Sequence, residues 1–184
     1  MKPRELALPS APMLTHFTRA AKNASALDNL IAIIEQGVVK GARRMIRGRR
    51  AVVSLFDAPF DELGPLLDRR NRRRYEPFGI AIDKRYAFKH GARPVIYLPL
   101  HEAMELLAPD ERWRVVTIEM DRTPAIDWTH EREWRLAGDL VLEPRCFSAL
   151  VASWRDADAI FEHFDGHPPC AGVIPLDAIF GQFV

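Results

Sequence analysis

The chain has few of the features that mark disulfide-rich, zinc-binding or membrane proteins. Its 184 residues include only two cysteines, Cys146 and Cys170, which do not form a CxxC pair. Cysteines so few and so placed favour buried free thiols over a disulfide framework or a zinc site. No apolar run approaches the roughly 18–20 residues that cross a bilayer. We therefore expect a cytoplasmic protein in a reducing compartment, without contact with a membrane.

Common nucleotide-binding and targeting signatures are also missing. The sequence holds no GxGxxG and no GxxxxGK[ST] loop, which argues against a Rossmann or P-loop site. Residues 1–5 include charged side chains but no apolar stretch follows them, so no secretory signal is expected. With 48% hydrophobic residues, no repeat and no linker, the sequence predicts a single domain over residues 1–184. Three prolines within residues 1–12 predict an extended N-terminal arm.

Charge is nearly balanced overall, at a formal net +1, but it is unevenly distributed. Residues 40–93 hold 15 Lys or Arg and 6 acids, which leaves 11 basic and 19 acidic residues elsewhere. Such segregation suggests a polyanionic ligand, and arginine suits bidentate contacts to phosphate. The alternative is two solvated arginine-rich loops. The candidate nucleic-acid contacts are Arg43, Arg44, Arg47, Arg49, Arg50, Arg69, Arg70, Arg72, Arg73 and Arg74.

Hydrophobic periodicity predicts short strands interleaved with short helices. Ser25 is a suitable N-cap and Gly37 a suitable end for the first helix. The absence of a regular strand–helix–strand rhythm of about 30 residues favours an α+β fold. The expected strands cover residues 13–18, 51–56, 78–82, 94–98, 113–120, 133–141, 148–153 and 171–175. The expected helices cover residues 26–36, 60–73, 84–90, 101–107 and 156–164.

Two segments far apart in the sequence carry polar side chains where a structural strand would prefer apolar ones. His16 lies on the first strand, and Thr18 shares its face because strand side chains alternate. An imidazole so placed can hold ribose hydroxyls, or it can be a satisfied structural histidine. Glu131 and Glu133 are expected on one face of a later strand, where a carboxylate can stabilise an oxocarbenium-like transition state. The alternative is that both glutamates pair with neighbouring arginines.

A third candidate segment runs from Tyr75 to Tyr86. Gly79 permits close approach of a ligand or of a neighbouring backbone. Tyr86 opens a short helix and could stack on a flat ring such as nicotinamide, or pack that helix onto the sheet. Two patterns could suggest a metal site, but both are weak. Asp127 and the nearby acids resemble a metal-dependent nuclease cluster, yet no lysine accompanies them as in nucleases. A histidine pair near the C-terminal end would need a helix to present it, and Gly166 interrupts that helix. No metal site is predicted.

The order of these segments carries a resemblance that no one of them carries alone. The chain resembles the abortive-infection AbiGi-type family of phage-resistance proteins. More broadly, it resembles the His–Tyr–Glu group of ADP-ribosyltransferases, which includes the poly(ADP-ribose) polymerases and, more loosely, the DarT toxins. The matching stretches lie within about residues 14–142, and the last of them is the most specific. They are His16–Thr18, Val53–Pro59, Phe78–Ile80, Arg93–Tyr97 and Glu131–Arg135.

This resemblance implies an α+β domain with a split, mixed sheet of the ADP-ribosyltransferase type and short flanking helices. It implies NAD as substrate, His16 holding a ribose, Tyr86 stacking on nicotinamide and Glu133 as the catalytic carboxylate. Thr18, Ser54 and Glu131 would be supporting polar groups. The expected function is transfer of ADP-ribose to a macromolecule, with DNA or RNA favoured, in a toxin or phage-defence setting. The alternative is a non-catalytic nucleic-acid-binding or antitoxin-like component, and a toxin would imply an antitoxin partner.

Overall fold

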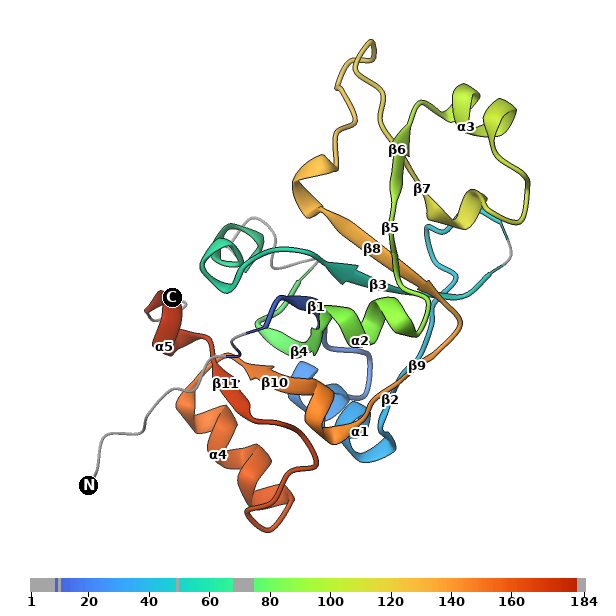
Figure 1. Cartoon of the computed structure of the whole chain (residues 1–184). Coiled ribbons are helices and arrows are strands. Elements are labelled where there is room, and N and C mark those ends of the chain that lie inside the picture. The colour runs from blue at the N-terminus through green and yellow to red at the C-terminus, as the bar shows by residue number, and fades with distance from the viewer. Residues whose placement is uncertain (1–8, 10, 49, 68–74, 182–184) are drawn as a thin grey trace.

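The structure, a computed structural model, describes residues 9, 11–48, 50–67 and 75–181 (Figure 1). Short helices and strands alternate along the chain, so the predicted α+β class is confirmed. The strands are β1 (Met13–Thr18), β2 (Val38–Val39), β3 (Val52–Phe56), β4 (Phe78–Asp83), β5 (Arg93–Pro94), β6 (Ile96–Leu98), β7 (Val115–Thr117), β8 (Glu133–Ala137), β9 (Leu140–Val141), β10 (Phe147–Val151) and β11 (Val173–Pro175). The α-helices are α1 (Ala26–Gln36), α2 (Lys84–Lys89), α3 (Leu100–Leu106), α4 (Trp154–His163) and α5 (Asp177–Phe180).

Seven of these strands form one mixed sheet in the order β11-β10-β4-β1-β3-β8-β5. Only β10 and β11 run parallel in it, and the other neighbours are antiparallel. Its centre is narrowly joined, because β1 and β3 share a single residue pair, Thr15 with Phe56. Two small sheets, β2–β9 and β6–β7, flank it. The predicted mixed sheet is therefore confirmed, with one narrow junction between its two halves.

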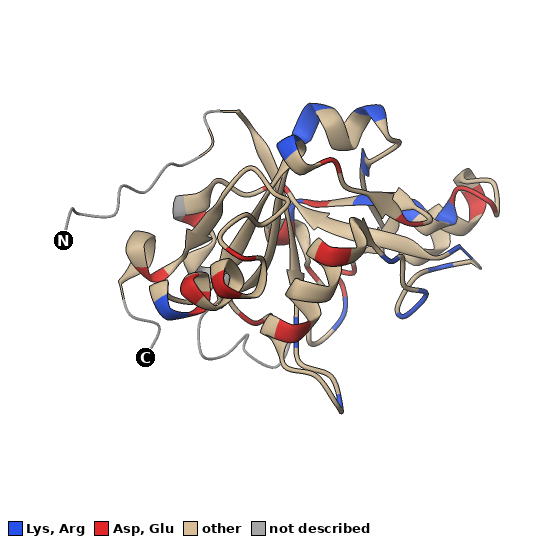
Figure 2. Ribbon diagram, turned by 90° about the horizontal axis from the view of Figure 1, so that it is seen from below, with Lys and Arg blue, Asp and Glu red and all other residues tan. Residues whose placement is uncertain are grey.

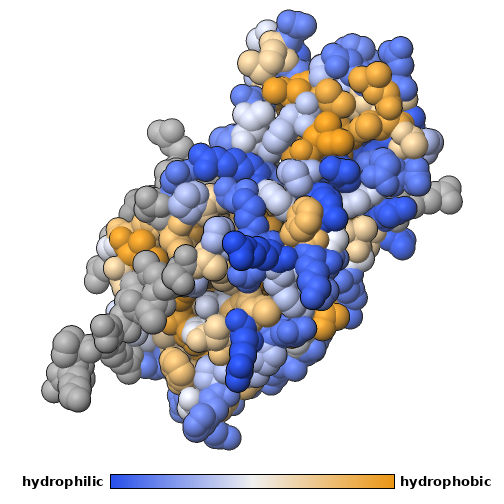
Figure 3. All heavy atoms as spheres, in the orientation of Figure 1, coloured by the Kyte–Doolittle hydropathy of each residue, from blue (hydrophilic) through white to orange (hydrophobic). Residues whose placement is uncertain are grey.

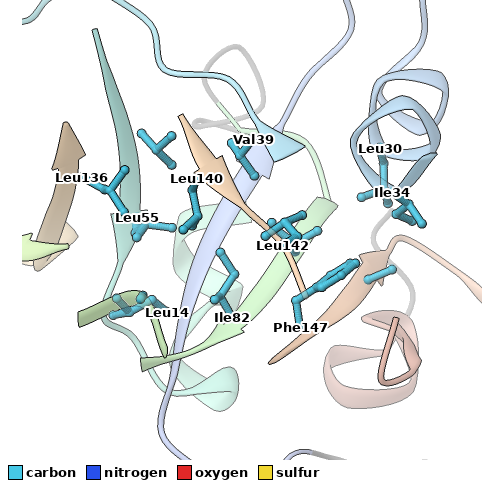
Figure 4. Packing of buried hydrophobic residues seen from close by; sticks show 14 of the residues in the cluster. Leu14, Leu30, Ile34, Val39, Leu55, Ile82, Leu136, Leu140, Leu142 and Phe147 are labelled. Atoms are coloured by element: carbon cyan, nitrogen blue, oxygen red, sulfur yellow. The ribbon is translucent and has the colours of Figure 1, made fainter. Parts of the chain in front are cut away.

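One face of the sheet carries the larger hydrophobic cluster. Alternate residues of β1, β3, β4 and β10 point into it, where they meet apolar side chains of α1, α2 and α4. Leu14, Leu55, Ile82 and Phe147 are at most 2% exposed and lie at its centre (Figure 4). Burial of a side chain of this size contributes roughly 1.5–3 kcal/mol. This face fixes the relative positions of β1 and β3, which carry His16 and Ser54.

Helix α1 shows how local sequence fixes one element of that face. The Ser25 side chain accepts a hydrogen bond from the Asp28 backbone, and the Asp28 side chain accepts one from the Ser25 backbone. This reciprocal capping box satisfies backbone donors that the first helical turn leaves unpaired. Gly37 ends the helix at φ 60°, a left-handed conformation that costs glycine little. Both predicted boundaries of this helix are confirmed.

The opposite face is covered only in part. Ala81, Leu150 and Ile174 pack there against Leu67 and the C-terminal segment that ends in α5. Farther along this face, Phe17 and Phe56 pack with the ring of Tyr75. Beyond those rings the sheet is left open to a cavity. The uncovered part of this face is the place where a ligand can reach β3 and β8.

Gly79 is needed because β1 passes very close to β4. A Cβ at Gly79 would lie 2.1 Å from the carbonyl oxygen of His16. Real Cβ atoms do not approach a backbone oxygen so closely, so the residue has to be glycine. The close approach proposed from sequence is therefore that of a neighbouring backbone, and the backbone concerned is that of His16.

Several predicted elements are shorter than expected. The helix predicted over residues 60–73 is replaced, within its described part, by two 3-10 turns, Phe60–Glu62 and Gly64–Leu67, since Pro65 cannot continue an α-helical ladder. Residues 68–73 of that prediction lie outside the described residues. The strand predicted over 133–141 breaks into β8 and β9 at Gly138, where φ is 86°. Cys146 and Cys170 are free and partly buried, and burial raises the pKa of both thiols.

Candidate functional site

A cavity of about 720 Å³ lies on the open part of the sheet. Its volume falls within the range of roughly 300–1,000 Å³ that small-molecule and cofactor sites occupy. We call it the site cavity. The sheet side is formed by residues of β1, β3 and β8, and the remaining wall comes from loops and from β7. Its lining residues are His16, Phe17, Arg44, Met45, Ile46, Arg47, Ser54, Phe56, Tyr75, Val115, Val116, Thr117, Ile126, Trp128, Glu131, Glu133 and Arg135.

His16 occupies the gap where β1 and β3 diverge. Its Nδ1 lies 2.8 Å from the backbone carbonyl oxygen of Ser54. Because a carbonyl only accepts, Nδ1 carries the proton and the neutral ring keeps Nε2 as an acceptor. Burial lowers the pKa of His16 below its usual value, and the bond to Ser54 opposes this shift only in part. A neutral imidazole of fixed tautomer is therefore part of the cavity wall.

Glu133 is held by a buried arginine two residues farther along β8. The Arg135 Nε donates to one carboxylate oxygen at 2.8 Å, and Nη2 donates to the other at 3.0 Å. Arg135 also donates through Nη1 to the backbone carbonyls of Trp113 and Val115. The backbone N–H of Glu133 donates to the Tyr97 hydroxyl at 3.1 Å, and burial raises the pKa of that hydroxyl. The Nη1 bonds of Arg135 tie β8 to the segment that leads into β7, while the bidentate contact holds Glu133 within β8.

Glu131 lies outside the strand, in contrast to the sequence prediction. It ends the 3-10 turn Thr129–Glu131, and Arg132 follows it at φ 42° before β8 begins. The Asp127 carboxylate accepts from the backbone and hydroxyl of Thr129, which stabilises this turn. The two glutamates therefore do not share a strand face, yet both are less than 10% exposed and line the site cavity. The Tyr75 hydroxyl donates to Glu131 Oε1 at 2.8 Å.

Part of the cavity wall is basic. Arg44 and Arg47 line it, and Arg47 Nη2 donates to the Thr117 hydroxyl at 2.6 Å. In Figure 1 the segment between β2 and β3 runs beside β7, consistent with that bond. Figure 2 shows that most basic residues lie on the part of the molecule away from the two chain ends. The lining of the site cavity thus combines the carboxylates of Glu131 and Glu133 with the guanidinium groups of Arg44, Arg47 and Arg135.

The remaining predicted nucleic-acid contacts are only partly described. Arg43 is exposed, and Arg50 lines a second cavity of about 370 Å³, which also includes Arg47 and Trp113. The other predicted arginines, Arg49, Arg69, Arg70, Arg72, Arg73 and Arg74, lie outside the described residues.

The structure brings some predicted NAD-binding residues together and places others elsewhere. His16, Ser54, Glu131 and Glu133 all line the site cavity, whereas Thr18 and Tyr86 are not among its lining residues. The Tyr86 hydroxyl donates to the Val141 carbonyl at 3.0 Å, and its ring packs on His90. These contacts correspond to the packing alternative for Tyr86. Tyr75 also lines the cavity, and no local sequence pattern indicated a site role for it, although it follows an arginine run and precedes a buried strand.

Other wall residues had no strong sequence signal. Thr117, Trp128 and Arg135 reach the cavity only through the path of the backbone. Arg135 is one of the neighbouring arginines, and its ion pair with Glu133 corresponds to the pairing alternative for that glutamate. Within the described part of the chain, no three His, Cys, Asp or Glu side chains are grouped so that they could hold a metal ion. Asp127, the third acid of the nuclease hypothesis, is engaged by Thr129.

Comparison of the chain with models of protein families, with curated proteins and with solved structures finds no match. Among the described residues, no helix is both long enough and apolar enough to cross a membrane.

Proposed function

We propose that the protein is an NAD-dependent ADP-ribosyltransferase that modifies a macromolecule, with nucleic acid as the favoured acceptor. The observation that carries this proposal is that one cavity is lined by His16, by Glu131 and Glu133, which lie far from it in the sequence, and by Arg44 and Arg47. A toxin or phage-defence role, with an antitoxin partner, follows from the sequence resemblance and forms part of the proposal.

The charge distribution of the cavity suits NAD. NAD carries a pyrophosphate, two riboses and a positively charged nicotinamide ring. Arg44 and Arg47 supply donors for the pyrophosphate, because guanidinium groups bind phosphate oxygens in bidentate fashion. His16, neutral and with Nε2 as an acceptor, can receive a hydrogen bond from a ribose hydroxyl. The acidic wall is then left for the end of the ligand where positive charge develops.

The reaction breaks the bond between C1′ of the ribose and the nicotinamide nitrogen. The bonding electron pair leaves with nicotinamide, and positive charge spreads over C1′ and the ring oxygen of the ribose. A nucleophile of the acceptor then forms a bond to C1′ and gives up its proton to solvent. A carboxylate close to the developing charge stabilises that transition state.

The contacts favour Glu131 over Glu133 for this role. Both oxygens of Glu133 already accept from Arg135, so its charge is largely balanced by the guanidinium before any ligand arrives. Glu131 is the other carboxylate that lines the cavity, and its Oε1 accepts from the Tyr75 hydroxyl at 2.8 Å. We therefore assign charge stabilisation to Glu131 and give Glu133 the role of positioning β8 through Arg135. The sequence resemblance implies the other assignment, with Glu133 as the catalytic carboxylate and Glu131 as a supporting group.

The test is to incubate the purified protein with NAD labelled in its adenylate half and to measure both nicotinamide release and NAD binding. We expect Glu131→Gln to reduce nicotinamide release at least 100-fold, about 2.7 kcal/mol of transition-state stabilisation, while NAD binding is retained. Glu133→Gln should chiefly lower stability. If Glu133→Gln abolishes turnover without loss of stability while Glu131→Gln stays active, the assignment of roles is wrong.

A wild-type protein that neither binds NAD nor releases nicotinamide would overturn the enzyme proposal. The non-catalytic alternative, which the basic wall favours, predicts a different pattern. Nucleic-acid binding would then weaken with salt and be lost when Arg43, Arg44 and Arg47 are neutralised. Neither glutamate variant would change it.

A further inference from the structure

An exposed methionine in an unusual backbone conformation lies at the wall of the site cavity. Met45 has φ 59°, in the left-handed region, and the residue is 81% exposed, the most exposed of the large hydrophobic residues described. A non-glycine residue pays of order 1–2 kcal/mol for this conformation. Exposure of an apolar thioether side chain to water also forgoes the stabilisation that its burial would give. Both costs persist at a position that lines the cavity.

Hydrogen bonds anchor the segment around Met45 on both sides, so the position of the methionine at the cavity is fixed. Ala42 exchanges two backbone hydrogen bonds with Val52, at 2.8 and 2.9 Å, which closes the base of the loop. The Ile46 N–H donates to the Arg43 carbonyl and closes the turn itself. On the far side, the bond from Arg47 to Thr117 ties the turn to β7. We call residues 43–47 the arginine turn.

The charges beside Met45 indicate the kind of partner that this turn fits. Arg43 and Arg44 immediately precede Met45 and are exposed, and Arg47 follows it. Figure 3 shows larger apolar areas around α3 and β6, but Met45 differs from those in being flanked by cations and in lining the cavity. An apolar side chain inserted among arginines is the arrangement with which proteins separate stacked bases while they hold the flanking phosphates.

We propose that the arginine turn is the acceptor-recognition element and that Met45 inserts beside a base of a single-stranded nucleic acid. The base would be separated from its stacked neighbour and held at the site cavity, while Arg43 and Arg44 contact adjacent phosphates. Enzymes that act on a base must take it out of the stack before its reacting atom is accessible. This inference rests on the proposed function, since it names the acceptor of the same site.

The experiment places 2-aminopurine, whose fluorescence rises when it is unstacked, in a single-stranded oligonucleotide and uses the Glu131→Gln protein without NAD. We expect saturating protein to raise the fluorescence several-fold. A second substitution in this protein, Met45→Ala, should remove most of the fluorescence rise, whereas Met45→Leu in its place should retain it. Met104→Ala, which shortens an exposed methionine on α3, is the matched control and should change nothing. Arg43→Gln should reduce the slope of log affinity against log salt by about 0.7 and leave the fluorescence at saturation unchanged.

Because the readout uses no NAD, it separates this inference from the enzyme proposal. Equal fluorescence with Met45 and with Ala at that position, or no binding of the oligonucleotide, overturns the inference even if nicotinamide release is observed. Transfer of label to protein in preference to nucleic acid also overturns it. Absence of nicotinamide release, together with a Met45-dependent fluorescence rise, overturns the enzyme proposal alone.

Discussion

The guanidinium of Arg135 holds both carboxylate oxygens of Glu133, at 2.8 and 3.0 Å, with both side chains less than 10% exposed. The same guanidinium donates to the carbonyls of Trp113 and Val115. One arginine therefore links the sheet strand β8 to the segment that forms the far wall of the site cavity. This pair connects the stability of the fold with the shape of the site.

Breaking this pair from one side should be costly. Arg135→Met leaves the Glu133 carboxylate buried without its counterion, and we expect a loss of about 3–5 kcal/mol in the free energy of unfolding. Chemical denaturation monitored by circular dichroism measures it. Lys40→Gln, which removes one partner of the exposed pair with Asp139, is the control and should leave the unfolding midpoint unchanged. A loss for Arg135→Met no larger than for the control would contradict a structural role for the pair.

His16 should make stability depend on pH on the acid side of neutrality. Its pKa is lowered in the folded state by burial, so below about pH 6.5 the unfolded chain takes up a proton that the native protein does not. The free energy of unfolding should therefore fall as pH drops through that region, by up to about 1.4 kcal/mol per pH unit from this group. Above it, both states are neutral and the contribution disappears.

The measurement is denaturant unfolding of the wild type and of His16→Gln between pH 5 and pH 8. The difference at pH 8 reports the cost of losing the bond to Ser54, and the change in that difference toward pH 5 reports the titration. His16→Gln should show the shallower slope. Parallel pH curves for the two proteins would mean that His16 titrates alike when folded and unfolded.

Gly79 should not tolerate even a methyl group. The Cβ of an alanine there would lie 2.1 Å from the His16 carbonyl oxygen, so β1 would have to move away from β4. We expect Gly79→Ala to cost about 1–3 kcal/mol or more, as overpacking does elsewhere. Gly172→Ala is the matched control, because its Cβ would meet its nearest neighbour, Ser148 Oγ, at 4.0 Å. Similar unfolding midpoints for the two variants would refute the close-approach explanation.

Thr117 should matter for ligand binding and little for folding. Its hydroxyl accepts from Arg47 at 2.6 Å, and Thr117→Val keeps the shape of the side chain while removing that acceptor. Arg47 then loses a contact that pre-orients it toward the cavity. We expect the Kd for NAD to rise about tenfold, equivalent to about 1.4 kcal/mol. Isothermal titration measures the affinity, and an unchanged Kd would show that this contact does not organise the basic wall.

Local sequence signals predicted the elements whose boundaries depend on neighbouring residues. The first helix is bounded by Ser25 and Gly37 because capping and the left-handed end act within a few positions. Strand β1 has the predicted bounds, since its alternation faces a buried cluster. Over residues 60–67 the predicted helix is wrong, because Pro65 cannot continue an α-helical hydrogen-bond ladder and two 3-10 turns form there. The single strand face proposed for Glu131 and Glu133 failed because Asp127 caps a turn that ends at Glu131.

The sequence by itself determined that His16, Glu131 and Glu133 are chemically capable side chains at the edges of predicted strands, and that basic charge gathers before residue 94. Only the tertiary structure decided which of them meet. The order β1-β3-β8 brings distant segments to one cavity, which no local pattern encodes. Burial of Arg135 beside Glu133 and of Tyr75 beside Glu131 then gives two similar carboxylates different partners. Local rules act over a few residues, whereas the partner of a buried charge is set by the packing of the whole chain.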